Sequence, residues 1–174
     1  MFFVRSASAR DVAAVREVLV ASWRATYVPL YGADKVEAMI AEWHSPEAIT
    51  ANMARPDGEY LVADDGKRLG GVAFATMSRI AGEGAEADTT IKLQQLYVAP
   101  GLEGQGIGRD LFAEIESCFP DASRLQLEVD PGNATAIAFY TAHGMTEVGH
   151  TTDCGGMGKG ILALVMQKDL TSQD

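Results

Sequence analysis

Cysteine is scarce in this chain of 174 residues. The two cysteines, Cys118 and Cys154, lie far apart, and neither stands at metal-ligand spacing from other ligating residues. This scarcity argues against a metal centre and is typical of a protein of the reducing cytoplasm. We therefore predict a cytoplasmic protein with no bound metal.

Long hydrophobic runs and clusters of basic residues are also missing. The N-terminal segment MFFVRSASARD has too short an apolar run for a signal peptide, and no stretch approaches the roughly 20 apolar residues of a membrane span. The net charge is −10 and no Lys/Arg run occurs, which argues against a nucleic-acid backbone as the main partner. We therefore expect neither a membrane nor a nucleic acid as a partner, and the charge mildly favours a cationic substrate.

The length and composition indicate one globular domain. Hydrophobic residues make up 47% of the chain and charged residues 22%, which is the balance of a folded protein with a sizeable core. We predict a single domain over residues 1–170, followed by a short C-terminal tail over residues 171–174.

The stretch LQQLYVAPGLEGQGIGRDLF, from Leu93 to Phe112, predicts a strand, a glycine loop and a helix. Its β-forming residues lead to Pro100, which cannot donate to a sheet ladder. The loop contains four glycines, namely Gly101, Gly104, Gly106 and Gly108. The helix that follows carries an apolar stripe formed by Ile107, Leu111, Ile115 and, as a small core residue, Cys118. Exposed loop amides and the positive end of a helix form an anion site, and phosphate is its usual occupant.

The spacing of the glycines narrows the choice of ligand. A dinucleotide fingerprint that starts at Gly104 requires a glycine where Arg109 stands. A Walker loop requires Lys and then Ser or Thr after its last glycine, but Gly106 is followed by Ile107 and Gly108. Another mode of nucleotide binding, and a turn that binds nothing, stay open on this stretch alone.

The rest of the chain predicts an ordered series of helices and strands. A capping box of Ser8 and Asp11 opens the first helix, which we expect to end near Tyr27 because Pro29 and Gly32 follow. The other predicted elements are a strand at 2–5, helices at 35–43 and from Ser45 to before Pro56, a hairpin of strands at 60–62 and 69–77, a flexible linker at 81–88, a strand at 125–129, a helix at 134–143, and a closing hairpin around a turn at 155–160 whose second strand covers 161–166. This order predicts an α/β fold (α+β mixed sheet), with a mostly antiparallel central sheet in one layer and helices on both faces.

The glycine loop resembles the acetyl-CoA loop of the GNAT superfamily of N-acetyltransferases, in which a strand L-x-V-x-P leads to Q/R-x-x-G-x-G/A. Leu96, Val98, Pro100 and the last two loop glycines match, whereas Glu103 stands where the family usually has Gln or Arg. The resemblance extends to the element order of essentially the whole chain. It implies acetyl-CoA as cosubstrate, with the loop amides on the pyrophosphate and the strand backbone on the acetyl carbonyl and pantetheine arm. The implied cofactor-binding residues are Leu96, Tyr97, Val98, Glu103, Gly104, Gln105, Gly106, Ile107, Gly108, Arg109 and Asn133.

A second stretch, NATAIAFYTAHG, resembles the GNAT signature N-x-x-A-x-x-F/Y-Y-x-x-x-G-F. Asn133 and Tyr140 lie two helical turns apart, about 10 Å along the axis, and so share a face. The resemblance implies that Asn133 binds the pantetheine or phosphate end and that Tyr140 reaches the sulfur. The structural alternative is a helix N-cap at Asn133 and a core aromatic at Tyr140.

Acyl transfer from a thioester to an amine needs a base, a site for the carbonyl oxygen and an acid for the departing thiolate. In family members that acetylate protein α-amino groups, a glutamate in an L-E-V setting is the proposed base and the helix tyrosine the acid. Glu128 and Tyr140 match this catalytic pair, although Glu128 could also be an exposed strand carboxylate. We therefore predict an acetyl-CoA-dependent N-acetyltransferase that acts by direct transfer. The alternative is a non-catalytic sensor module that binds acyl-CoA without turnover.

The acceptor is a primary amine that the sequence does not specify further. It is either a protein N-terminus or a small amine such as a polyamine, an amino acid or an aminoglycoside, and homodimers are frequent in the family. The family lines its acceptor pocket with the early helices and the closing hairpin, which here correspond to Trp23, Tyr27, Tyr31, Trp43 and the turn at 153–159. The histidines, His44, His143 and His150, are scattered and are expected on the surface or in loops.

Overall fold

The computed structural model describes residues 1–80, 88–153 and 160–171. The predicted linker at 81–88 and the predicted turn at 155–160 fall mostly outside these residues, and so do Cys154 and the end of the predicted tail.

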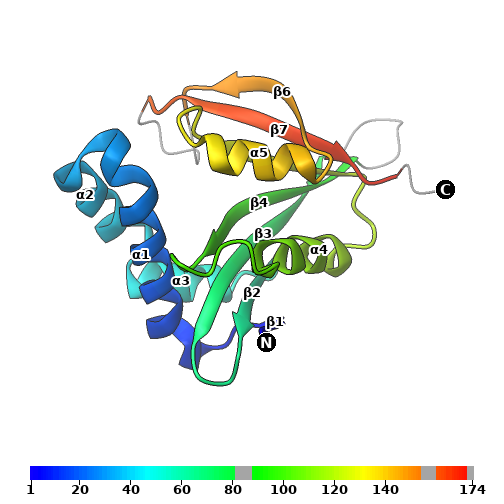
Figure 1. Cartoon of the computed structure of the whole chain (residues 1–174). Helices are drawn as coiled ribbons and strands as arrows, with labels where there is room; N and C mark the ends of the chain where they lie inside the picture. The colour runs from blue at the N-terminus through cyan, green and yellow to red at the C-terminus, as the bar shows by residue number, and fades with distance from the viewer. Residues whose placement is uncertain (81–87, 154–159, 172–174) are drawn as a thin grey trace. The chain divides into compact units, whose positions relative to one another are not determined.

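The described residues form one mixed sheet with helices, as the sequence predicts (Figure 1). The strand order is β1-β2-β3-β4-β5-β7-β6. The pair β4/β5 is parallel, whereas β1/β2, β5/β7 and β6/β7 are antiparallel. The elements are β1 (Phe3–Ser6), the 3-10 helix η1 (Ala9–Asp11), α1 (Val12–Tyr31), α2 (Ala33–Trp43), α3 (Pro46–Met53), β2 (Gly58–Asp64), β3 (Leu69–Ile80), β4 (Asp88–Val98), α4 (Ile107–Cys118), β5 (Arg124–Val129), α5 (Ala134–Ala142), β6 (Thr146–Thr151) and β7 (Ala163–Asp169).

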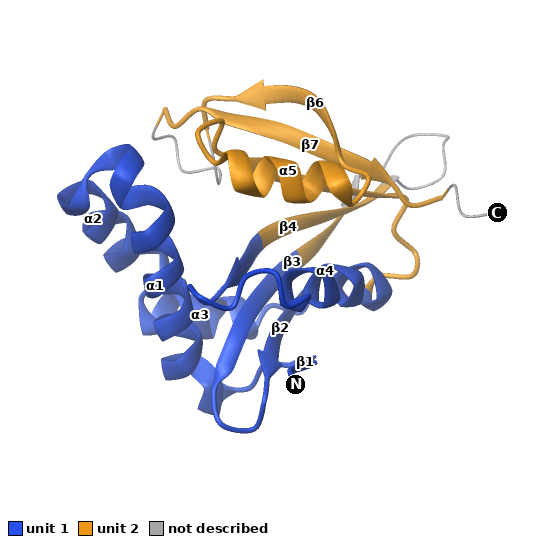
Figure 2. Ribbon diagram, in the orientation of Figure 1, with its two compact units in different colours: residues 1–75, 95–118 blue, residues 76–94, 119–174 orange. Residues whose placement is uncertain are grey.

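The chain divides into two compact units (Figure 2). Unit 1 consists of residues 1–75 and 95–118, and unit 2 consists of residues 76–94 and 119–174. The long strands β3 and β4 contribute residues to both units.

Unit 1 has helices on both faces of its strands. On one face, α1 and α3 bury an apolar cluster against alternate residues of β2 and β3. On the other face, α4 packs so closely that a Cβ at Gly71 would lie 2.8 Å from Ile107 and 2.9 Å from Leu111. The core cluster is made of Val15, Val18, Leu19, Ile49, Tyr60, Val62, Leu69, Val72 and Phe74.

The predicted stripe of α4 is confirmed except at its end. Ile107, Leu111 and Ile115 are buried, and Phe112 joins them. Cys118, expected to be a small core residue, is only half-buried, because it is the last residue of the helix, where the chain turns toward Pro120.

The first helix is longer than predicted. Pro29 lies inside α1, which continues to Tyr31. Proline removes one backbone donor, and this loss is small at an exposed position in the last turns of a helix. Gly32 ends the helix instead, because its N–H bonds to the carbonyl of Val28 at 2.9 Å and its φ of 82° is one that glycine adopts without strain.

An aromatic cluster joins α1, α2 and β4 within unit 1. Trp23 is its centre, with ring centroids 4.6 Å from Tyr27, 5.4 Å from Trp43 and 6.5 Å from Tyr97. Only 7% of Trp23 is exposed. We define the aromatic cluster as these four residues together with His44 and Tyr31, which stacks on Tyr27 at 6.1 Å.

His44 is buried, contrary to the expectation of a surface or loop histidine. It lies at the end of α2, is 3% exposed, and its ring meets Trp23 edge to face at 5.0 Å. Neither ring nitrogen has a hydrogen-bond partner among the described residues. Burial lowers the pKa of His44 to about 4, and the charge of Arg16, whose Nε–H donates to the His44 carbonyl at 3.1 Å, acts in the same direction.

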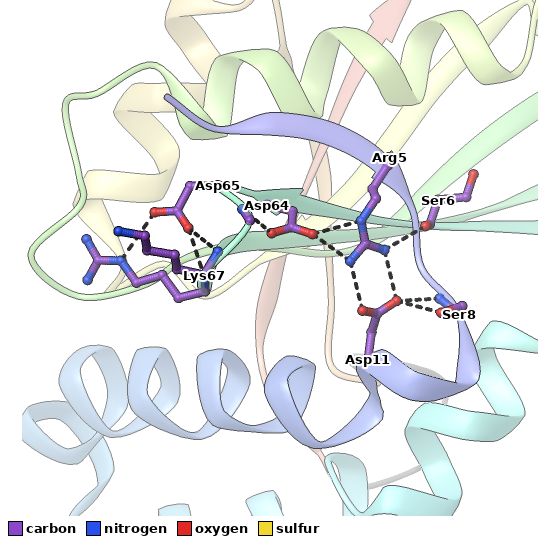
Figure 3. A network of polar contacts seen from close by, with 9 residues as sticks. Arg5, Ser6, Ser8, Asp11, Asp64, Asp65 and Lys67 are labelled. Atoms are coloured by element: carbon purple, nitrogen blue, oxygen red, sulfur yellow. Dashed lines mark hydrogen bonds and ion pairs between the residues drawn. The ribbon is translucent and has the colours of Figure 1, made fainter.

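A charged network fixes the start of the chain to the first helix and the hairpin (Figure 3). The Arg5 guanidinium donates to both carboxylate oxygens of Asp11, at 2.9 and 2.8 Å, and to Asp64 at 3.0 and 2.8 Å. Asp11 also accepts the Ser8 backbone N–H at 2.8 Å, as the predicted capping box requires. These bonds from Arg5 and Ser8 hold the pKa of the buried Asp11 well below its usual range.

Unit 2 is built on the strands β4, β5, β7 and β6. Parallel β4/β5 pairing places Ile91 beside Leu125, and antiparallel pairing places Glu128 beside Val165. The β6/β7 register shifts between Glu147 and Gly149. Within the part of the chain that the structure describes, no helix has the length and apolar character needed to cross a membrane.

Replacing Asp11 with Asn is expected to lower the free energy of unfolding by about 2–3 kcal/mol at pH 7, because it removes the negative charge that pairs with a partly buried Arg5 and one of the two oxygens that accept its hydrogen bonds. Urea titration measures the change. Asp57→Asn is the matched control, since Asp57 pairs with Arg55 at an exposed site, where such pairs contribute at most about 1 kcal/mol. Equal losses in the two variants would contradict the structural role of the network.

His44 makes stability depend on pH in a defined window. Its pKa of about 4 in the folded state lies below the ordinary value near 6.5, so the unfolded chain binds the extra proton and stability falls as pH drops from 6.5 to 4. The expected loss is about 2 kcal/mol between pH 7.5 and 5.0. Urea midpoints of the wild type and His44→Leu at both pH values measure it. The variant loses this slope whereas His150→Gln, at an exposed position, keeps it; an unchanged slope in His44→Leu refutes the assignment.

Candidate active site

The glycine loop leaves β4 and enters α4 through residues that only glycine accommodates well. Gly101, Gly104 and Gly106 have φ values of 85°, 75° and 83°. Gly108, predicted as a fourth loop glycine, lies in the first turn of α4. The first N–H groups of a helix have no intrahelical partner and form its positive end, so this loop and the start of α4 suit an anion.

The positive φ of Gly106 favours glycine at this position of the loop, and the end of a long side chain lies close to it. A Cβ there would lie 2.9 Å from Nη2 of Arg109, whose guanidinium therefore lies against the loop. Arg109 is paired with Asp110, with Nη2 2.9 Å from a carboxylate oxygen, and both side chains are exposed. The predicted loop residues Gly104 and Gln105 are exposed as well.

Glu103 uses its carboxylate within the loop. Its Oε2 accepts the backbone N–H of Gly101 at 2.7 Å. Leu102 N–H bonds to the Ala99 carbonyl at 3.0 Å, so the turn is closed by one backbone bond and one side-chain bond. The acidic residue that departs from the family pattern thus has a local structural partner.

The end of β4 is held from two sides in unit 1. Ser22 on α1 donates its hydroxyl to the carbonyl of Val98 at 2.9 Å, and the N–H of Ala99 bonds to the carbonyl of Gly70 at 2.9 Å. Leu96, Tyr97 and Val98 are half-buried, and the Tyr97 ring reaches the aromatic cluster. The strand end predicted to bind the acyl arm is therefore a fixed backbone segment.

Glu128 lies in β5 of unit 2 and is exposed, on the opposite side of the strand from Leu127 and Val129. The alternation is as predicted. It leaves open both readings of Glu128, as a base and as an exposed strand carboxylate, and its role stays a prediction.

Asn133 and Tyr140 occupy the start and the buried turn of α5. The Asn133 Oδ1 accepts the backbone N–H of Ala136 at 3.2 Å, so Asn133 is an N-cap in this structure. Tyr140 is 8% exposed, and its ring meets Phe139 edge to face at 5.4 Å. Capping uses the side-chain oxygen of Asn133. The predicted cofactor contact of this residue stays a prediction.

The structure brings the four aromatic residues of the predicted acceptor pocket together. Trp23, Tyr27, Tyr31 and Trp43 belong to one aromatic cluster, whereas the turn at 153–159 lies almost wholly outside the described residues. Among the described residues, no group of three or more His, Cys, Asp or Glu could hold a metal ion.

Two polar residues of this region were not identified from the sequence, although their helical spacing carries a signal. Ser22 follows Val15 and Val18 on the buried stripe of α1. His44 comes directly after the last residue of α2 and follows Ile40 by four positions, so it continues the spacing of the buried stripe of that helix. A polar residue at the spacing of a buried stripe marks a core position, which is the signal that identifies both.

Comparison with known proteins identifies the family of the chain. The family model described as acetyltransferase (GNAT) family matches residues 14–145. The chain is 27% identical over 147 residues to spermidine N(1)-acetyltransferase of Thermoplasma acidophilum, covering 81% of this chain and 86% of that protein.

Two solved structures are also similar. The PaiA N-acetyltransferase of T. acidophilum, solved in complex with coenzyme A, superposes with a TM-score of 0.81 at 23% identity, over 97% of this chain and 99% of that one. The ribosomal-protein-alanine N-acetyltransferase of Brucella melitensis gives a TM-score of 0.66 at 25% identity, with the same coverage. The predicted fold is confirmed. The chain therefore belongs to the acetyltransferase (GNAT) family, and the predicted transfer of an acetyl group from acetyl-CoA to an amine is the activity of that family.

Proposed function

We propose that this protein acetylates a primary amine of a small polyamine, with acetyl-CoA as donor and without an acyl-enzyme. The choice of a polyamine as acceptor rests on a lysine side chain of this protein that packs against the aromatic cluster. The Lys35 ammonium lies over the Tyr31 ring, 4.6 Å from its centroid, and Tyr27 stacks beside Tyr31. An alkylammonium group of a polyamine has the same chemistry as this lysine end, and aromatic faces bind such cations.

The charge around the cluster supports the same acceptor. Helix α2 presents exposed carboxylates at Asp34 and Glu42, besides Glu37, which pairs with Arg24 at 2.6 Å, and the whole chain has a net charge of −10. A surface of this sign attracts a polycation over long range and raises its local concentration. The relative from T. acidophilum that is named for spermidine acetylation agrees with this proposal.

The reaction joins the amine to the acetyl group and releases CoA as a thiol. The neutral amine attacks the thioester carbonyl, a carbon–nitrogen bond forms, and the carbon–sulfur bond breaks as the tetrahedral intermediate collapses. One proton leaves the nitrogen and one proton reaches the sulfur, so the products are the acetamide and free CoA thiol. Oxygen charge in the intermediate is stabilised by fixed backbone N–H groups, for which the end of β4 is our candidate.

Glu128 and Tyr140 are assigned to the two proton transfers. A carboxylate accepts the amine proton, and Glu128 is exposed, so it can pass that proton on to water. A phenol is protonated at neutral pH and can donate to the thiolate, which is the role given to Tyr140. The loop from Gly101 to Gly108 is assigned to the diphosphate of acetyl-CoA.

A second candidate acceptor is the α-amino group of a protein N-terminus. It is favoured by the L-E-V setting of Glu128 and by the similarity to a ribosomal-protein-alanine N-acetyltransferase at 25% identity. The non-catalytic sensor is the alternative to both acceptors.

An acceptor panel tests the function. Thiol release from acetyl-CoA is measured with spermidine, spermine, putrescine, free lysine, an aminoglycoside and short peptides with a free N-terminus. We expect kcat/KM for a polyamine to exceed that for every peptide at least tenfold, a difference of about 1.4 kcal/mol in transition-state stabilisation. Highest activity on peptides would select the second acceptor. Binding of acetyl-CoA with no release above background from any acceptor would select the sensor.

Replacing Tyr140 with Phe tests its role as the acid. Because only a hydroxyl is removed, kcat is expected to fall about 10²-fold, with the Kd for acetyl-CoA changed less than threefold. Steady-state kinetics and calorimetric titration measure the two quantities. Tyr60→Phe is the matched control, since Tyr60 is a buried tyrosine of unit 1 whose hydroxyl donates to Gln95 at 2.7 Å. An unchanged kcat in Tyr140→Phe would remove Tyr140 from the mechanism.

A further inference from the structure

We propose that Glu103 limits the affinity of this protein for acetyl-CoA, because its carboxylate occupies one amide of the glycine loop and places a negative charge beside the others. The inference rests on the proposed function, in which this loop binds the diphosphate. It concerns the strength of that binding, which the family assignment leaves undefined.

The geometry of the loop carries the inference. Glu103 Oε2 accepts the Gly101 N–H at 2.7 Å, a short distance typical of a charge-assisted hydrogen bond. Gly101 and Gly104 lie on either side of Glu103 in the sequence, and both have positive φ, so the backbone turns at both positions. A carboxylate that accepts a loop N–H does what a phosphate oxygen does at such a site. Glu103 therefore competes with an incoming phosphate oxygen for this donor.

The charges of the loop act in the same direction. Between residues 101 and 110 the charged side chains are Glu103, Arg109 and Asp110, which leave a net charge of −1. The guanidinium of Arg109 lies against Gly106, but Asp110 pairs with it at 2.9 Å and offsets its charge. A diphosphate thus approaches a loop whose side chains are net negative, and the backbone N–H groups and the partly offset charge of Arg109 must attract it against that charge. Removing the charge of Glu103 makes these side chains neutral overall.

The hydrogen bond also holds the loop closed, so the choice of variant decides what the test measures. In Glu103→Gln the side-chain oxygen can still accept the Gly101 N–H, and only the charge is lost. Glu114→Gln is the matched control, because Glu114 is an exposed carboxylate in the C-terminal half of α4, the helix that follows the loop, and its removal changes the net charge equally.

Calorimetric titration with CoA at low and high salt tests the proposal. We expect Glu103→Gln to bind CoA about threefold to tenfold more tightly at 20 mM salt, the size of a screened interaction between nearby charges. The gain should shrink to less than twofold at 0.5 M salt, and Glu114→Gln should stay within twofold of the wild type at both.

Several outcomes would overturn the proposal. Unchanged or weaker CoA binding by Glu103→Gln would show that the carboxylate has no effect or helps. An equal gain in Glu114→Gln would show a general effect of net charge, and a gain that persists at high salt would exclude electrostatics. If the wild type and both variants bind no CoA, the proposed function itself fails and the inference fails with it. Binding by the wild type without a gain in Glu103→Gln overturns this inference alone.

Discussion

The fixed end of β4 is the constraint on which the rest of unit 1 depends. The carbonyl of Val98 accepts the Ser22 hydroxyl, and the N–H of Ala99 donates to the carbonyl of Gly70, so the last backbone groups of the strand are bonded to two different elements. The glycine loop therefore starts from a fixed point, and its positive-φ residues set its path into α4. Gly71 allows α4 to approach the sheet, since a Cβ there would meet Ile107 and Leu111.

The end of β4 contacts the aromatic cluster, which contains buried polar atoms without hydrogen-bond partners at His44. A buried donor or acceptor without a partner costs about 1–3 kcal/mol, and an edge-to-face aromatic pair contributes about 0.5–1.5 kcal/mol beyond its buried area. Trp23 makes such ring contacts with Trp43 and with His44. These ring contacts offset the free-energy cost of burying His44 as a neutral imidazole. They do not offset the cost of a buried imidazolium, so the packing of unit 1 at this point requires the neutral form of His44.

The sequence predicted features that depend on neighbouring residues and missed those that depend on distant ones. The capping residue Asn133, the loop glycines from Gly101 to Gly106 and the stripe of α4 up to Ile115 follow from local spacing, and each is found where it was predicted. The bonds from Arg5 to Asp64 and from Ser22 to Val98 join residues 59 and 76 positions apart, so no local pattern indicates them. The roles of the candidate site residues depend on how substrate atoms lie among side chains from distant parts of the chain, which no pattern of neighbouring residues indicates.

The chemistry of Cys118 supports the proposed direct transfer over an acyl-enzyme on this residue. A thiol attacks a thioester as the thiolate, and reactive cysteines lie in electropositive surroundings that lower their pKa. Cys118 has the opposite surroundings. Partial burial raises the pKa of its thiol, and the carboxylates of Glu59 and Glu114 raise it further, so the thiolate is a minor form at neutral pH. In the proposed direct transfer, the amine attacks acetyl-CoA itself, and the chain supplies a site for the carbonyl oxygen and two proton transfers. The candidates for the proton transfers are a carboxylate and a phenol in unit 2.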